Sequence, residues 1–166
     1  MKFLADKHGY NLKTVEAAVE VNALQKTALF RKAADRLITF GGLKVAVLGL
    51  TFKPGTDDLR EAPSLDNVEL LLAQGANIYA YDPVGIENFK KKYPEGKIGR
   101  GSITYVKRAD EALRAANICF IFTEWQDIKD ITPDTYKKLM KPALVYDGRN
   151  IHSLQSMKDA GVEYYS

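Results

Sequence analysis

An apolar segment that leads into a loop and a helix start constrains the fold of this chain most. Residues 45–50 form an unbroken apolar run behind the pair Gly41-Gly42. Such a run is typical of a strand buried on both faces, as in a parallel sheet. Thirteen residues separate it from Ser64, which we expect to cap a helix carrying an apolar face. A strand, a loop and a helix N-terminus in this order favour anion binding, because free backbone N–H groups point into the loop.

From Leu43 onwards, strand and helix patterns alternate along the chain. This alternation predicts an α/β fold, a Rossmann-like doubly wound parallel sheet of about six strands, preceded by a long helix. We expect strands at 44–50, 77–81, 103–106, 117–122, 143–146 and 162–165. We expect helices near 65–74, 85–93, 109–115, 133–140 and 152–160.

The first forty residues read as helical. Met1 to His8 is typical of the end of one helix, and Asn11 can cap a second helix running to about Phe40. The second helix carries two apolar stripes on different sides, so we expect it to have two partners, its own domain and another subunit. We therefore divide the chain into a helical segment, 1–41, and a Rossmann-like domain, 42–166. Asn22 interrupts the main apolar face and is interpreted as an interface residue that fixes register.

The loop after the first strand carries two cations, Lys53 and Arg60, and a turn signal at Pro54-Gly55. Solvated loop charges are the plain alternative. We favour a ligand role, because ligands of open α/β sheets bind where strands end. Arg149 also follows a strand, so Lys53 and Arg149 are expected to face one crevice. For Arg149, a plain loop arginine paired with Asp147 is an equal alternative.

The standard dinucleotide fingerprint, G-x-G-x-x-G, is not found after the first strand. Gly49 is followed by Leu50, Thr51, Phe52 and Lys53, which favours a ligand held by side chains. Asp82 ends the second strand, where an acidic residue would hold a ribose, but Asp82-Pro83 is also a turn signal, and we favour the turn.

Composition excludes several classes of function. The 166 residues carry a net charge of +3 and no basic stripe with interleaved aromatic residues, so nucleic acid is not an expected partner. No apolar run approaches the ~20 residues of a membrane span. The single cysteine, Cys119, lies in an apolar strand, which fits a buried thiol and a reducing, cytoplasmic location. We expect no metal site.

The segment Leu48-Gly-Leu-Thr-Phe-Lys-Pro-Gly-Thr-Asp-Asp-Leu-Arg-Glu-Ala-Pro-Ser64 resembles the start of the C-terminal domain of the UDP-glucose/GDP-mannose dehydrogenase family. The likeness continues through Tyr81-Asp82-Pro83, Thr123-Glu124-Trp125 and Asp147-Gly148-Arg149, and so covers nearly the whole chain. The motif Pro-Gly-Thr-Asp-Asp-Leu-Arg-Glu-Ala-Pro is most similar to the corresponding motif of UDP-glucose 6-dehydrogenases.

The resemblance implies roles for four residues. Phe52 and Lys53 would contact the UDP-sugar, with Lys53 reaching the diphosphate or the sugar, and Arg149 would contact the same substrate. Arg60 would reach NAD, which the family binds mainly through an N-terminal domain. The helical segment would belong to the family's central dimerisation region, giving a homodimer. Glu124 and Trp125 are not assigned to the site; Trp125 could stack on a base but more often such a residue caps the core.

The family oxidises an alcohol twice, and a cysteine nucleophile captures the intermediate aldehyde. That cysteine segment and the NAD fingerprint are not found in these 166 residues, and Cys119 does not match the motif. We therefore expect the C-terminal part of an NAD-dependent UDP-glucose 6-dehydrogenase, cut from a longer protein and inactive alone. A non-catalytic dimerisation module remains an alternative. So does a fragment of a UDP-N-acetylmannosamine or GDP-mannose dehydrogenase.

Overall fold

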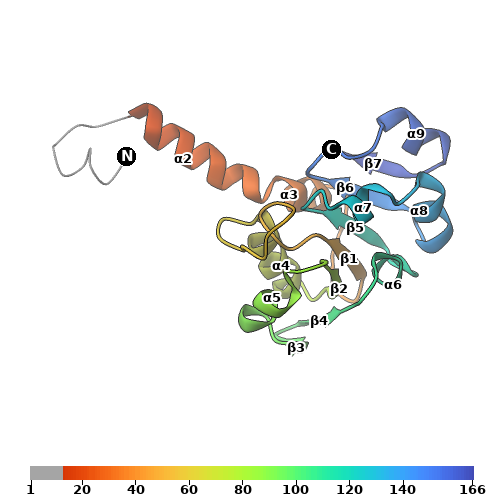
Figure 1. The fold of residues 1–166 in the computed structure, drawn as a ribbon, viewed down its shortest axis with the longest axis horizontal. Coiled ribbons are helices and arrows are strands. Elements are labelled where there is room, and N and C mark those ends of the chain that lie inside the picture. The colour runs from red at the N-terminus through yellow and green to blue at the C-terminus, as the bar shows by residue number, and fades with distance from the viewer. Residues whose placement is uncertain (1–12) are drawn as a thin grey trace.

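The chain is built on one seven-stranded sheet with the order β3-β4-β2-β1-β5-β6-β7 (Figure 1). The computed structural model describes residues 13–166. All neighbouring strands are parallel except β3, which runs antiparallel to β4 at one edge. The predicted Rossmann-like α/β fold is confirmed. The strands are β1 (Lys44–Leu48), β2 (Asn77–Tyr81), β3 (Gly96–Ile98), β4 (Gly101–Tyr105), β5 (Ile118–Ile121), β6 (Leu144–Asp147) and β7 (Glu163–Tyr165).

Helices cover both faces of the sheet. The described helices are α2 (Lys13–Lys26), α3 (Ala28–Ala34), α4 (Pro63–Ala73), α5 (Ile86–Lys92), α6 (Ala109–Leu113), α7 (Gln126–Lys129), α8 (Pro133–Leu139) and α9 (Leu154–Asp159). On one face, α3, α4 and α5 pack on the sheet, and on the other α6, α7, α8 and α9 do so. Alternate residues of β1 supply the two cores: Val45 and Val47 face one, Ala46 and Leu48 the other. The strand is therefore buried on both faces, as its apolar run predicts.

The long N-terminal helix is broken, which corrects the prediction of one helix to about Phe40. The helix α2 ends at Lys26, and α3 ends at Ala34. At the break, the Nδ2 group of Asn67 in α4 donates to the carbonyl of Lys26 at 2.7 Å, so a side chain replaces a helical N–H. The predictions for Met1 to His8 and for the cap at Asn11 lie outside the described residues.

Within the described part of this helical region, α3 packs on the sheet and α2 does not. Leu29 and Ala33 of α3 are buried in the core, and Phe30 stacks on Phe40 at 5.1 Å. The helix α2 projects away from the sheet (Figure 1), with Val21 and Leu24 62% and 52% exposed. The boundary between a helical segment, 1–41, and a domain, 42–166, stays a prediction.

Three local features differ from the predictions. Strand β3 and the short helix α7 were not expected. Ser64 is not the helix cap: Ala62 occupies that position and Pro63 begins α4, where its missing N–H costs nothing. The Ser64 hydroxyl instead donates to the carbonyl of Leu50 at 2.5 Å, which fastens α4 to the end of β1. None of the described helices is both long and apolar enough to cross a bilayer.

Candidate functional site

The loops that follow β1, β5 and β6 meet at one edge of the sheet. These strands are parallel neighbours, so all three end on the same side. Backbone hydrogen bonds between neighbouring strands continue into the residues that follow them. Phe122 N donates to Leu48 O at 2.9 Å, and Gly148 N donates to Ile121 O at 3.0 Å. The Thr123 hydroxyl also donates to the carbonyl of Thr51. The carboxyl edge of β1, β5 and β6 is therefore one connected surface.

Gly49 allows the loop after β1 to lie directly against the loop after β5. Its φ is +83°, a conformation that residues with a side chain rarely adopt. A Cβ atom at this position would stand 2.5 Å from Cβ and 2.6 Å from the amide nitrogen of Thr123. Gly49, which stands at the first glycine position of the G-x-G-x-x-G pattern, is thus required here for close packing of the two backbones.

Asp82 organises the start of the loop after β1. Its Oδ1 accepts from the amides of Val84 and Gly85 at 3.0 and 2.6 Å, so the favoured turn interpretation is confirmed. Its Oδ2 accepts from the amides of Leu50 and Thr51 at 2.7 and 3.2 Å. The carboxylate is buried and surrounded by these donors, so it is not placed to hold a ribose.

Trp125 is half-buried and caps the core. Its ring packs against the cluster that includes Leu48 and Ile128. Its Nε1 donates to Oδ2 of Asp82 at 3.0 Å, so the polar end of the indole is also satisfied. The core-capping interpretation of Trp125 is confirmed, and its contact with Asp82 was not foreseen.

Phe52 and Lys53 lie at the base of the long loop between β1 and α4. The amide of Phe52 donates to Asp58 O at 2.9 Å, and the carbonyl of Lys53 accepts from the Thr51 hydroxyl at 3.3 Å. Gly55 takes a φ of +79°, consistent with the Pro54-Gly55 turn signal. The Phe52 side chain is 45% exposed although it is large and apolar. An exposed aromatic ring beside a lysine is suited to a ligand, but the roles of both residues stay predictions.

Arg60 lies further along the same loop and is paired within it. Its Nε and Nη2 groups donate to Asp58 Oδ1 and Oδ2 at 3.0 and 2.7 Å. The hydrogen bonds from Arg60 are the main cause that lowers the pKa of Asp58 to about 2. The Arg60 side chain is 88% exposed, so this pair is open to solvent. A role for Arg60 toward NAD stays a prediction.

Arg149 is held by Glu124 rather than by Asp147, which corrects the alternative interpretation of this arginine. Its Nη2 donates to Glu124 Oε1 at 2.8 Å, and its Nε donates to Oε2. These hydrogen bonds raise the pKa of Arg149 and lower that of Glu124. Within this loop, Asp147 accepts from backbone groups, the amides of Arg149 and Ile151, at 2.7 and 2.9 Å.

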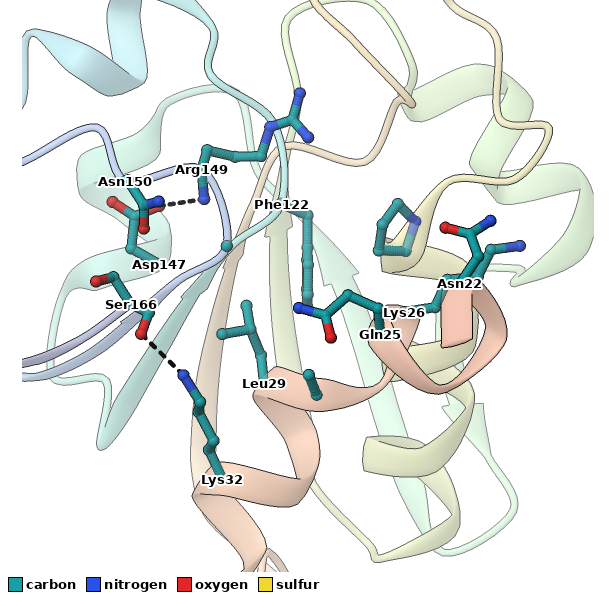
Figure 2. A pocket seen from close by; sticks show the side chains of 13 residues that line it. Asn22, Gln25, Lys26, Leu29, Lys32, Phe122, Asp147, Arg149, Asn150 and Ser166 are labelled. Atoms are coloured by element: carbon teal, nitrogen blue, oxygen red, sulfur yellow. Dashed lines mark hydrogen bonds between the residues drawn. The ribbon is translucent and has the colours of Figure 1, made fainter. Parts of the chain in front are cut away.

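A cavity of about 280 Å³ lies between the α2–α3 junction and the loop after β6 (Figure 2). Asn22 and Gln25 line its helical side, and Arg149 and Asn150 line the opposite side. Lys53 does not line this cavity, so the predicted common crevice of Lys53 and Arg149 stays a prediction. Within residues 13–166, no cluster of three potential metal ligands is found.

Comparison with known proteins identifies the domain. Residues 46–153 match the sequence model of the UDP-glucose/GDP-mannose dehydrogenase family, UDP binding domain. The chain belongs to this family. The match covers the strands and loops described above, from β1 to the residues after Arg149.

Curated relatives extend the likeness to almost the whole chain. UDP-glucose 6-dehydrogenase YwqF of Bacillus subtilis is 38% identical over 157 residues, which is 95% of this chain and 34% of that protein. UDP-glucose 6-dehydrogenase TuaD of the same organism is 35% identical over 98% of this chain and 34% of its own length. The chain thus spans about a third of the length of these relatives.

A solved structure shows the same fold. A UDP-glucose dehydrogenase from the hyperthermophilic archaeon Pyrobaculum islandicum superposes with a TM-score of 0.79 at 26% identity. The superposition covers 98% of this chain and 34% of that protein. The resemblance stated on motifs is therefore confirmed at the level of family and fold.

Proposed function

We propose that this chain is the UDP-sugar-binding part of an NAD-dependent UDP-glucose 6-dehydrogenase, an enzyme that oxidises UDP-glucose to UDP-glucuronate in two steps. The match of 46–153 to a UDP-binding domain carries the proposal. The geometry supports it, because the loops after β1, β5 and β6 form one connected edge that bears Lys53 and Arg149. This edge is where open parallel sheets bind ligands.

The substrate is held by side chains in this proposal. Lys53 supplies a compact charge for the diphosphate or the sugar, and Arg149 supplies a planar group that suits phosphate or carboxylate oxygens. Phe52 offers an exposed apolar face to the same ligand. The attraction between a diphosphate of charge about −2 and these side chains is stronger where part of the site is shielded from water.

The domain does not fit a dinucleotide at its own first strand-to-helix turn. The amides of Leu50 and Thr51, which begin that turn, already donate to the Asp82 carboxylate. We therefore propose that NAD is bound mainly outside these 166 residues and that Arg60 reaches it from the long loop. When bound, NAD would accept a hydride from the substrate alcohol; the residues of this chain bind and orient the UDP-sugar.

The chain alone is proposed not to turn over UDP-glucose. Its one cysteine, Cys119, is fully buried in β5 and cannot act as the nucleophile. Reduction of NAD by the purified chain in the presence of UDP-glucose would contradict this part of the proposal.

Thermal unfolding tests ligand choice directly. UDP and UDP-glucose should raise the melting temperature of the chain more than NAD does, because binding to the native state stabilises it. Lys53→Ala should reduce this rise. Lys97→Ala is the matched control, because Lys97 lies exposed in β3 at the far edge of the sheet. Stabilisation by NAD equal to that by UDP-glucose would count against the proposal.

The family contains other sugar specificities, and the curated relatives described above are named for UDP-glucose. The same titration with UDP-N-acetylmannosamine and GDP-mannose therefore tests the proposed sugar. A larger shift with either ligand than with UDP-glucose would reassign the fragment within its family.

A second candidate is a non-catalytic interaction module. The exposed apolar residues of α2, including Val19, Val21 and Leu24, favour it. A homodimer through this helix is compatible with both candidates and is proposed here for either. The module would show no shift with UDP or UDP-glucose. The cytoplasmic location stays a prediction.

A further inference from the structure

The pair formed by Glu124 and Arg149 joins the loops after β5 and β6 at the proposed ligand edge. Both contacts are hydrogen bonds between a guanidinium and a carboxylate, and they use both carboxylate oxygens. The two side chains are only 27% and 31% exposed, so neither is a freely solvated surface charge. This geometry distinguishes the pair from the more exposed Arg60–Asp58 pair in the first loop.

The backbone on both sides of the pair is fixed. Thr123 and Trp125, the neighbours of Glu124, donate to Thr51 O and Asp82 Oδ2. The backbone of Arg149 is held by the buried carboxylate of Asp147, which also accepts from the hydroxyl of Tyr164 at 2.7 Å. The segments that carry Glu124 and Arg149 are therefore both anchored, which limits the positions that the two side chains can take.

Glu124 occupies only one edge of the guanidinium. Its oxygens take the Nε and Nη2 groups, and within the described residues Nη1 makes no hydrogen bond to the protein. Arg149 also lines the 280 Å³ cavity between the α2–α3 junction and the loop after β6 (Figure 2). The group can thus present N–H donors to a ligand while Glu124 retains its own two contacts.

We propose that Glu124 is a positioning residue that orients Arg149 for the UDP-sugar. The inference rests on the proposed function and deepens it by giving a role to Glu124, to which the family resemblance assigns none. Glu124 fixes the guanidinium before the ligand arrives. A free arginine would lose rotamer freedom on binding, whereas one already held by Glu124 loses less.

The contrary possibility is that Glu124 competes with the ligand for Arg149. A carboxylate in competition with a diphosphate would weaken binding, and its removal would then tighten binding. A carboxylate that orients the arginine strengthens binding, and its removal weakens it. Whether replacement of Glu124 weakens or tightens binding of UDP-glucose therefore separates orientation from competition.

The test uses calorimetric titration of the 166-residue chain with UDP-glucose. Glu124→Gln keeps the size of the side chain but removes its charge, and it should weaken binding roughly three- to tenfold. Glu124→Asp, which restores the charge on a shorter side chain, should recover part of this loss. Unchanged or tighter binding by Glu124→Gln would overturn the proposal.

A double-mutant cycle separates orientation of Arg149 from a general structural effect. Arg149→Ala should weaken binding, and adding Glu124→Gln in that background should have no further effect. An equal loss from Glu124→Gln in both backgrounds would show that Glu124 does not act through Arg149.

Glu163→Gln is the matched control. It removes the charge from another Arg–Glu pair, that of Glu163 with Arg36. Glu163 is the first residue of β7 and lies at the amino ends of the strands, away from the proposed ligand site, so the affinity for UDP-glucose should not change. Failure of the unmutated chain to bind UDP-glucose would overturn the proposed function and this inference together. Binding that depends on Arg149 but not on Glu124 would overturn the inference alone.

Discussion

The indole Nε1 of Trp125 donates a 3.0 Å hydrogen bond to Oδ2 of Asp82, and this contact passes across the end of β1. The same oxygen accepts from the amide of Leu50, just after β1. One buried carboxylate therefore fastens three loops, those that follow β2, β1 and β5. The contact explains how a long loop with two glycines can keep its first residues in a defined place.

Replacement of Asp82 should destabilise the domain strongly. Asp82→Ala leaves the buried amides of Leu50, Thr51 and Gly85 without their acceptor, and each unsatisfied buried donor costs about 1–3 kcal/mol. Partial rehydration will recover some of this, so we expect a total loss of about 3–5 kcal/mol. Urea unfolding followed by circular dichroism measures it.

Trp125→Phe is the matched test of the same cluster. It keeps an aromatic ring against the core but removes the N–H that reaches Asp82 together with part of the indole ring. The expected loss is about 1–2 kcal/mol, from one hydrogen bond and the smaller packed ring. A loss as large as that of Asp82→Ala would mean that ring packing, and not the carboxylate, holds the loops.

The stability of the chain should fall in mildly acidic solution because of His152. Burial lowers the pKa of His152 from its ordinary value of about 6.5, although the carboxylate of Asp147 acts in the opposite direction. Its ring also lies edge-on to Tyr136, with Nε2 3.1 Å from the tyrosine oxygen. The native state thus favours the neutral imidazole.

The direction of this pH dependence follows from the number of protons that the native and unfolded chains bind. Between the lowered native pKa and about 6.5, the unfolded chain binds more protons at His152, so the unfolding free energy decreases as the pH falls. The contribution is present above about pH 6.5 and is lost as the pH falls through the native pKa. His152→Gln should flatten the curve of urea midpoint against pH between about 7 and 5. An unchanged curve would contradict this account.

Cys119 should be inert in the native chain. It is fully buried in β5, and burial, with a smaller effect from Asp147, raises the pKa of its thiol well above the usual value. A disulfide reagent at pH 8 should modify it on the order of 100-fold more slowly than in urea, since modification requires opening of the sheet. The chain has one cysteine, so the unfolded endpoint is one thiol. Rapid native labelling would contradict burial.

The proposed homodimer should depend on the exposed apolar residues of α2. Leu24→Glu places a charge where Leu24 is 52% exposed in the single chain, so the folded domain should lose no more than about 0.5 kcal/mol. If the helix is the dimer contact, the same change buries a charge and should shift the chain to monomer. Light scattering after size exclusion measures this, with the urea midpoint as control. A dimer of unchanged affinity would place the contact elsewhere.

The central strands could be predicted from the sequence because their signal is local. The apolar run that includes Val45 and Val47 fits only a strand covered on both faces, and β1 begins at the expected Lys44. The cations after β1 and β6 could also be found, because sequence order places them at strand ends.

The interactions between loops could not be predicted in the same way. Glu124 and Arg149 are 25 residues apart, and Asp82 and Trp125 are 43 apart. Nothing in the local pattern of Glu124 distinguishes a paired carboxylate from a solvated one. Asp82 could be read as a turn residue from its neighbours, but only the fold shows that its second oxygen holds the loop after β1.

The break in the N-terminal helix could not be predicted for a related reason. The apolar pattern runs on through Leu29, Ala33 and Leu37, so it marks neither the break after Lys26 nor the end of α3 at Ala34. The partner that holds the break, Asn67, lies 41 residues from Lys26. Strand β3 has three residues, which is too short for an alternating pattern to be recognised.

The backbone at Gly49 has an evolutionary consequence. Because an added methyl group would collide with Thr123 and the backbone has a positive φ, a side chain at position 49 would force the two loops apart and strain the fold. Relatives that diverge in substrate should therefore vary the side chains that project from this edge while they keep its spacing. Changes in specificity would then be expected at positions such as 52, 53 and 124, and seldom at 49.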